Sequence, residues 1–219
     1  MRPHELEAIL HSVEGFNTPK IQLEQYETSA HLASQVLMLI DETDDLEGST
    51  VLDLGVGTGR LAIGSIALNA SYVLGVDIDN DALEQCHENC VQIQESEEDD
   101  TLLTSLDLLQ ADVLQDEFFT NFNNLFEIII MNPPFGTKQK PGIDMLFLKR
   151  AISLSPRVIY SLHKSSTREH ILKKAHEFGI PEPEVVATLR WDLPKTYNFH
   201  KLKSKDINVD LFRFENKDF

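Results

Sequence analysis

Residues 50–59 restrict the possible folds of this chain more than any other segment. Thr50–Leu54 is a short apolar run, and it leads into a turn with glycine at every second position, Gly55, Gly57 and Gly59. Because glycine has no Cβ, this spacing allows a tight turn and a close approach of the backbone to a bound molecule. The residues that follow, 61–70, have helical character. A strand, a glycine-rich turn and a helix predict the first unit of a strand–helix repeat.

The rest of the chain continues this alternation, which predicts a Rossmann-like α/β fold: a mostly parallel seven-stranded sheet with helices on both faces. We expect a single domain, in which an N-terminal helical segment (1–48) accompanies the core (49–219). Ser166 and Glu169 have the spacing of a capping box, so a helix should begin there and end near Phe178. The predicted strands are 50–54, 72–77, 106–111, 126–131, 157–162, 185–191 and 207–214, and the other predicted helices are 4–13, 30–40, 60–69, 79–93 and 143–153.

The net charge of −17 is unevenly distributed along the chain. Residues 1–137 hold 3 of the 19 Lys and Arg residues and 26 of the 36 Asp and Glu residues, a local balance of −23. Residues 138–219 hold the remainder, a local balance of +6. The acidic total argues against nucleic-acid binding, because phosphate contacts need cations. The segregation nevertheless allows one cationic face.

The composition also limits the compartment and the chemistry. Cys86 and Cys90 are the only cysteines, four residues apart on a predicted helix, and we interpret them as free thiols without a disulfide or a zinc ion. The sequence shows no signal peptide and no apolar run near twenty residues, so we expect a soluble intracellular protein.

Five clusters of polar or glycine residues follow predicted strands, and ligands of such sheets bind at the carboxyl ends of the strands. Asp77 stands at the spacing at which an acidic residue binds ribose hydroxyls, and Asp53 suits an aminoalkyl group or a hydrogen bond within the loop. The clusters are Gly55–Gly59, Asp77, Asp112 with Val113, Asn132–Phe135, and His163 with Lys164.

Asn132-Pro133-Pro134-Phe135 directly follows the apolar run 126–131. The Asn132 amide offers an acceptor, the prolines stiffen the loop, and Phe135 offers a flat face for a base, worth about 1–3 kcal/mol. This chemistry suits a planar amine that receives a methyl group. A simple turn after a buried strand is the other interpretation.

A nicotinamide dinucleotide competes with S-adenosylmethionine as the cofactor. Gly57–Ala62 fits a loose G-x-G-x-x-A pattern. A dinucleotide, however, gives no role to Asn132–Phe135, and a carboxylate such as Asp53 suits an amino group better than a pyrophosphate. We therefore favour S-adenosylmethionine, with S-adenosylhomocysteine as the product and no metal.

With these residues in view, the chain resembles the class I S-adenosylmethionine-dependent methyltransferases, and more narrowly the methyltransferase-like protein 5 family of ribosomal-RNA adenine N6-methyltransferases. The resemblance extends over nearly the whole chain, and the run Tyr160–His170 is its most specific part. The shared stretches are Leu23–Thr28, Ile130–Lys138, Asp144–Leu148, Tyr160–His170, Asp192–Lys195 and Phe199–Lys201.

The resemblance implies roles for individual residues. Asn132, Pro133, Pro134 and Phe135 would hold the target base. The residues around the cofactor would be Gln25, Thr28, Gly55, Thr58, Asp77, Asp112 and Val113, to which the glycine turn adds Asp53 and Gly57.

A second group of residues is expected to contact the substrate. Tyr26 and Phe199 could enclose the base, while aromatic residues interleaved with lysines over 197–205 suit single-stranded RNA. The other predicted contacts are His163, Lys164, His200, Lys201 and Lys203.

The function implied is N6-methylation of a specific adenosine in small-subunit (18S-type) ribosomal RNA, in the nucleus, including the nucleolus, and the cytoplasm. The resemblance also implies a heterodimer with a small zinc-binding activator protein, for which the strand 106–111 is a candidate edge. Other planar nitrogens stay open as targets: guanine N2 in RNA, adenine in DNA and glutamine N5 in protein. A non-catalytic cofactor-binding subunit is a further alternative.

Overall fold

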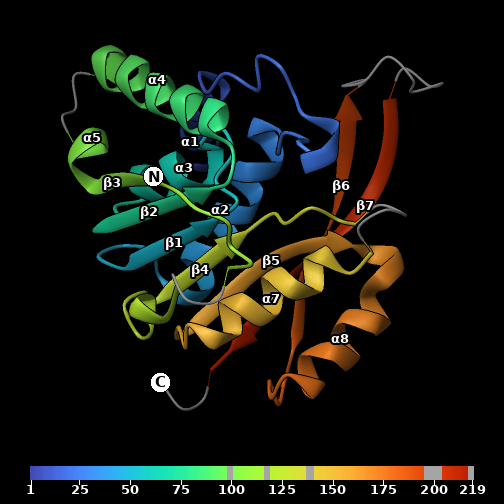
Figure 1. Cartoon of the computed structure of the whole chain (residues 1–219). Helices are drawn as coiled ribbons and strands as arrows, with labels where there is room; N and C mark the ends of the chain where they lie inside the picture. The colour runs from blue at the N-terminus through green and yellow to red at the C-terminus, as the bar shows by residue number, and fades with distance from the viewer. Residues whose placement is uncertain (98–100, 116–118, 137–140, 195–203, 217–219) are drawn as a thin grey trace.

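A seven-stranded sheet runs through the molecule with the strand order β3-β2-β1-β4-β5-β7-β6 (Figure 1). Strands β1 to β5 pair in parallel, whereas β7 is antiparallel to both β5 and β6. The predicted seven-stranded, mostly parallel sheet is therefore confirmed. The strands are β1 (Thr50–Leu54), β2 (Tyr72–Asp77), β3 (Leu106–Gln110), β4 (Ile128–Met131), β5 (Val158–Lys164), β6 (Glu184–Pro194) and β7 (Ser204–Glu215). This computed structural model describes residues 1–97, 101–115, 119–136, 141–194 and 204–216.

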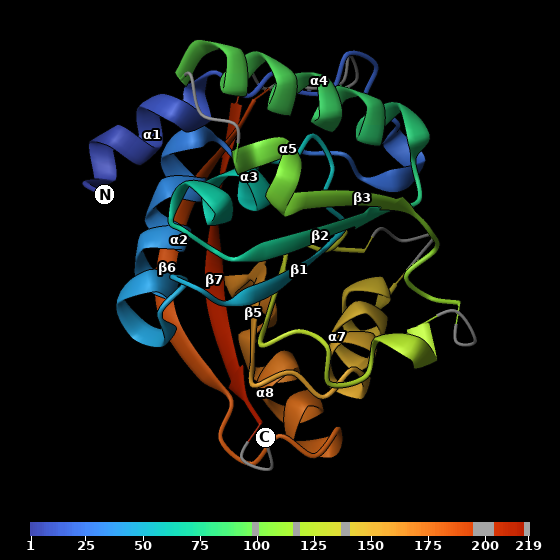
Figure 2. The same cartoon turned by 90° about the vertical axis from the view of Figure 1, so that its left-hand side faces the viewer.

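Helices cover both faces of the sheet, because successive strand residues point to opposite sides. Val51 packs into one buried cluster with α1 to α5, and its neighbour Leu52 packs into a second cluster with α7 and α8. Figure 2 shows the two helical layers on either side of the strands. The helices are α1 (Pro3–His11), α2 (Ala30–Asp44), α3 (Arg60–Ala67), α4 (Asn80–Glu97), α5 (Thr101–Ser105), α7 (Ile143–Ser153) and α8 (Arg168–Glu177). No helix in the described part of the chain has the length and apolar character needed to cross a membrane.

The register brings the carboxyl ends of four strands to one edge. Leu54 pairs with Val76, Asp77 pairs with Gln110, and Asp53 pairs with Ile130. The segments that follow β1, β2, β3 and β4 therefore begin side by side, at the edge where sheets of this type bind ligands.

Several local details differ from the sequence-based predictions. The prediction of a capping box at Ser166 is wrong, because Ser165–Thr167 forms a 3₁₀ turn. Helix α8 begins after Thr167, whose side chain makes no capping hydrogen bond. The short helix α5 was not predicted. Strand β5 continues past residue 162, because Lys164 pairs with Val209 of the neighbouring strand.

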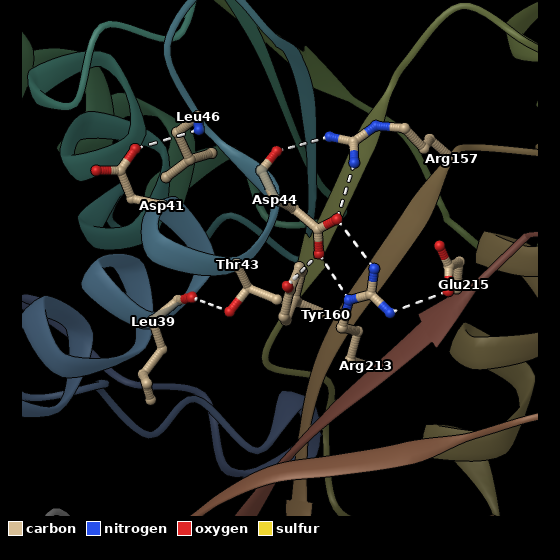
Figure 3. Close-up of polar contacts among 9 residues, drawn as sticks. All are labelled: Leu39, Asp41, Thr43, Asp44, Leu46, Arg157, Tyr160, Arg213 and Glu215. Carbon is tan, nitrogen blue, oxygen red and sulfur yellow. Dashed lines mark hydrogen bonds and ion pairs between the residues drawn. The ribbon is translucent and has the colours of Figure 1, made fainter.

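Helix α2 extends to Asp44, beyond the predicted end at residue 40, and its last residue joins the helix to the sheet (Figure 3). The Asp44 carboxylate accepts hydrogen bonds from Arg157 (2.8 Å) and Arg213 (2.7 and 3.0 Å), and also from the Tyr160 hydroxyl. Arg213 also pairs with Glu215. The cluster fixes the N-terminal helical segment against β5 and β7.

Candidate active site

A cavity of about 220 Å³ lies at the carboxyl ends of β1, β2, β3 and β4. The glycine turn, the loops after the other strands and the segment 22–28 form its walls. All of the predicted cofactor residues line this cavity: Gln25, Thr28, Asp53, Gly55, Gly57, Thr58, Asp77, Asp112 and Val113.

The glycine turn is held by the carboxylate at the end of β2. The backbone N–H of Gly57 donates to Asp77 Oδ2 and that of Asp79 donates to Asp77 Oδ1, each at 2.9 Å. Burial raises the pKa of Asp77 even though these two hydrogen bonds oppose the shift. Gly59, at φ +93°, caps α3, and a Cβ there would lie 2.4 Å from Cys86 Sγ. Backbone conformation and close packing therefore both require glycine at this position.

Cys86 and Cys90 are free and buried, and the Cys86 thiol lies next to Gly59 of this turn. The prediction of free thiols is confirmed.

Asp53 is an acidic residue of the cavity with an unusual environment. Its side chain is buried, the residue being 2% exposed, and no side chain in the described part of the chain donates to its carboxylate oxygens, although the backbone N–H of Ala62 approaches closely enough to oppose part of the pKa shift. Burial first, and the nearby charge of Asp77 second, raise the pKa of Asp53 to about 7. Burial of a carboxylate without a cationic partner is costly, so a cationic group would be favoured at this position.

The segment 20–25 is fastened to the start of α4. Gln25 accepts from the Lys20 backbone N–H and donates to Asp79 Oδ2, both at 2.7 Å. The Lys20 ammonium group bridges Asp79 and Asp81. Burial alone would raise the pKa of Asp79, but the hydrogen bonds from Lys20 and Gln25 outweigh it and hold that pKa below its usual value. These contacts close one side of the cavity.

The four residues of the Asn-Pro-Pro-Phe turn have different environments. Asn132 and Pro134 line the cavity, and the Asn132 Nδ2 donates to Thr28 Oγ1 at 2.9 Å. Pro133 is buried. Phe135 packs edge-on against Trp191, with ring centroids 5.5 Å apart, and the Lys164 Nζ lies 5.2 Å from its centroid. The turn thus joins the cavity to a partly exposed surface formed by Phe135 and Lys164, behind which Trp191 is buried.

His163 lies inside the protein and not on this surface. It is fully buried, with Nε2 2.7 Å from Ser161 Oγ and Nδ1 3.4 Å from Asp144 Oδ2, and its ring packs edge-on against Phe212. Because β5 continues to Lys164, alternation directs His163 to the same face as Ser161. This placement does not support the prediction that His163 contacts the substrate.

The remaining predicted substrate residues divide into two groups. Tyr26 lines the cavity, and burial raises the pKa of its hydroxyl. Phe199, His200, Lys201 and Lys203 lie outside the described residues.

The cavity also has a set of walls that sequence reasoning missed. They are mainly apolar side chains. Phe16 reaches the cavity from the turn-rich segment after α1, and Ile143 and Phe147 reach it from α7; only tertiary packing brings these three here, so the sequence carries no local signal for them. Ile78 and Leu114 directly follow the predicted residues Asp77 and Val113, so the strand ends could have indicated them.

The fold and the cavity define a class I methyltransferase. The family model of the "Ribosomal protein L11 methyltransferase (PrmA)" matches residues 26–132. The crystal structure of a candidate RNA methyltransferase from Pyrococcus horikoshii superposes with a TM-score of 0.79 and 33% identity, covering 99% of this chain and 96% of that one.

Full-length relatives narrow the class to one family. The rRNA N6-adenosine-methyltransferase METTL5 of Danio rerio is 47% identical over 98% of this chain and 99% of its own length. The Drosophila melanogaster protein of the same description is 43% identical over 98% of this chain and 97% of its own length. The chain belongs to the METTL5 family of methyltransferases.

Proposed function

We propose that this protein transfers a methyl group from S-adenosylmethionine to N6 of an adenosine in ribosomal RNA. The observation that carries the proposal is the amide of Asn132, which is held by Thr28 at the wall of a cavity whose buried carboxylate, Asp53, has no cationic partner in the described part of the chain. Membership of the METTL5 family supports the choice of adenosine over guanine N2, DNA adenine or glutamine N5.

The residues of the cavity fit this cofactor. Asp53 would receive its ammonium group, Asp77 would accept from the ribose hydroxyls, and Asp112 with Val113 would border the adenine. The buried carboxylate of Asp53 is the strongest sign of fit, because a cation would pair with a group that has no cationic partner among the described residues. When bound, S-adenosylmethionine supplies an electrophilic methyl group.

The turn after β4 would prepare the acceptor nitrogen. The exocyclic amine of adenine is a weak nucleophile because its lone pair is delocalised into the ring. Hydrogen bonds from this amine to Asn132 Oδ1 and to the Pro133 carbonyl favour a tetrahedral nitrogen with its lone pair free. Positioning of this kind accounts for much of the rate in group transfer. After transfer, the nitrogen loses its proton to water.

The substrate would enter as an extruded base. Leaving the stack costs a few kcal/mol in a duplex and less in an irregular segment. Stacking on Phe135 would offset part of this cost, and the Lys164 ammonium beside the ring would face a phosphate. The finer proposal is one adenosine of the small-subunit (18S-type) ribosomal RNA.

We also propose a heterodimer with a small zinc-binding activator protein, working in the nucleus and the cytoplasm. β3 forms one edge of the sheet, so its outer side is available for an added strand. Co-expression with the activator should raise the yield and the melting temperature, and a fluorescent fusion should show the compartments. Unchanged yield and melting temperature would contradict the heterodimer.

Asn132→Ala tests the activity. We expect methylation of ribosomal RNA, measured with tritiated cofactor and nucleoside analysis, to fall about 100-fold or more, while S-adenosylhomocysteine binding by calorimetry stays within about threefold. Asn121→Ala, at an exposed amide before β4, is the matched control and should resemble the unchanged protein. Label on a protein amide, or full activity in the folded Asn132 variant, would refute the proposal.

A further inference from the structure

Thr28 stands at a junction between three parts of the site. It is buried, its hydroxyl oxygen accepts from Asn132 Nδ2 at 2.9 Å, and its carbonyl accepts from Arg60 Nη1 at 2.7 Å. Asn132 belongs to the turn after β4, and Arg60 is the first residue of α3, directly after the glycine turn. One residue of the N-terminal segment therefore contacts both the Asn-Pro-Pro-Phe turn and the first residue of α3.

Arg60 fixes the backbone on which Thr28 stands. Besides Thr28, its guanidinium group donates to the Val13 carbonyl and lies 3.5 Å from a Glu27 carboxylate oxygen. Burial lowers the pKa of Arg60, and the Glu27 charge opposes this shift. The arginine thus ties both ends of the segment 13–28 to α3, which limits the positions that the Thr28 hydroxyl can take.

The orientation of the Asn132 amide matters because its two ends have opposite hydrogen-bonding character. The oxygen can accept from an amine, whereas the NH₂ group would face the amine donor to donor. In the contact that the structure shows, the Thr28 hydroxyl accepts from Nδ2, which places the nitrogen on the Thr28 side and leaves Oδ1 for the amine. In the folded protein Thr28 provides this contact from a chain segment 104 residues away.

We propose that Thr28 is a positioning residue for methyl transfer: its hydroxyl holds the Asn132 amide with the oxygen toward the acceptor amine. This inference rests on the proposed function and deepens it. It assigns Thr28 a role toward the Asn-Pro-Pro-Phe turn, in addition to the cofactor contact that the sequence predicts.

Thr28→Val and Thr28→Ser test the inference. With ribosomal RNA and saturating cofactor, Thr28→Val should lower kcat about tenfold, the size expected for one hydrogen bond, while the Kd of S-adenosylhomocysteine changes less than about threefold. Thr28→Ser keeps the hydroxyl and should recover most of kcat. Thr43→Val removes an exposed hydroxyl that donates to the Leu39 carbonyl of α2 and does not line the cavity, and it serves as the matched control.

Asn132→Asp provides a background that separates positioning from a merely structural role. A carboxylate has two equivalent acceptor oxygens, so either oxygen can accept from the substrate amine and no particular orientation has to be held. Thr28→Val should therefore cost less than about threefold in kcat in this background. The same tenfold loss in both backgrounds would overturn the inference.

The other outcomes are equally distinct. If Thr28→Val weakens S-adenosylhomocysteine binding and leaves kcat unchanged, Thr28 serves the cofactor and the inference is wrong. A serine variant as slow as the valine variant would also contradict it. Failure of the unchanged protein to methylate RNA while it binds S-adenosylhomocysteine would instead refute the proposed function.

Discussion

Asp53 links the protonation of the site to cofactor binding. In the ligand-free protein its pKa is raised to about 7, so the carboxylate is half protonated near neutral pH. A cationic ligand favours the ionised form. We therefore expect the Kd of S-adenosylhomocysteine, measured by calorimetry, to fall severalfold between pH 6 and pH 8, and the Asp53→Asn variant to lose this dependence. A dependence that persists in Asp53→Asn would show that another group titrates.

The same residue predicts how stability varies with pH. An unfolded aspartate titrates near pH 4, whereas folded Asp53 keeps its proton up to about pH 7. Between these values the folded state binds more protons, so Asp53 makes the free energy of unfolding decrease as the pH rises. Above pH 7, ligand-free Asp53→Asn should therefore be more stable than the unchanged protein in urea unfolding. Asp45→Asn, at an exposed carboxylate, should show no such gain.

At the scale of elements, the turn between β1 and α3 depends on Gly59. Alanine there would adopt φ near +93° and place its Cβ 2.4 Å from Cys86 Sγ. Gly48→Ala is a matched control, because Gly48 has φ +75° but open space around it. The left-handed conformation costs about 1–2 kcal/mol in both variants. We expect urea unfolding to show a clearly larger loss for Gly59→Ala, and equal losses would mean that the helix shifts without cost.

The end of α2 provides a second test at this scale. Asp44→Ala would leave two arginines and a tyrosine without their shared acceptor (Figure 3). Breaking a buried ion pair from one side costs about 3–5 kcal/mol, and urea unfolding should show a loss of this size.

The pKa of Asp44 should give the same cluster a pH dependence. Burial alone would raise this pKa, but the hydrogen bonds from Arg213 and Tyr160 outweigh it and hold the pKa below its usual value. The contribution of the cluster is therefore present above about pH 4 and is lost as the pH falls through the lower folded value. A loss of unfolding free energy below 1 kcal/mol for Asp44→Ala would contradict the proposed role of this cluster in linking α2 to the sheet.

Elements with a local sequence signal could be predicted, whereas features that depend on contacts between distant residues could not. The apolar runs of β1, β2 and β3 are local, and these strands begin and end at or next to the predicted residues. The end of β5 depends on Lys164 pairing with Val209, which no local pattern contains. The cavity residues at strand ends were predictable from the order of the elements, whereas Phe16 and Phe147 reach the cavity only through tertiary packing.

At the scale of the whole molecule, charge is segregated along the chain. Residues 1–137 have a balance of −23, and residues 138–219 have a balance of +6. An acidic protein that binds RNA must do so through its cationic part, since counterion release from phosphates drives such binding. Lys201, Lys203 and Lys205 are concentrated in one short stretch of this part.

Reversal of these three lysines to glutamate tests the charge argument for the molecule as a whole. Each lysine that neutralises a phosphate contributes about 0.7 to the slope of log K against log salt. The triple variant should therefore bind ribosomal RNA more weakly and with a slope smaller by about 2, while S-adenosylhomocysteine binding is unchanged. Lys173→Glu with Lys174→Glu, on α8, is the control for a general change of charge. Equal loss of RNA and cofactor binding in filter assays and calorimetry would mean that the lysine stretch supports the fold, because the loss of an RNA contact alone would not weaken cofactor binding.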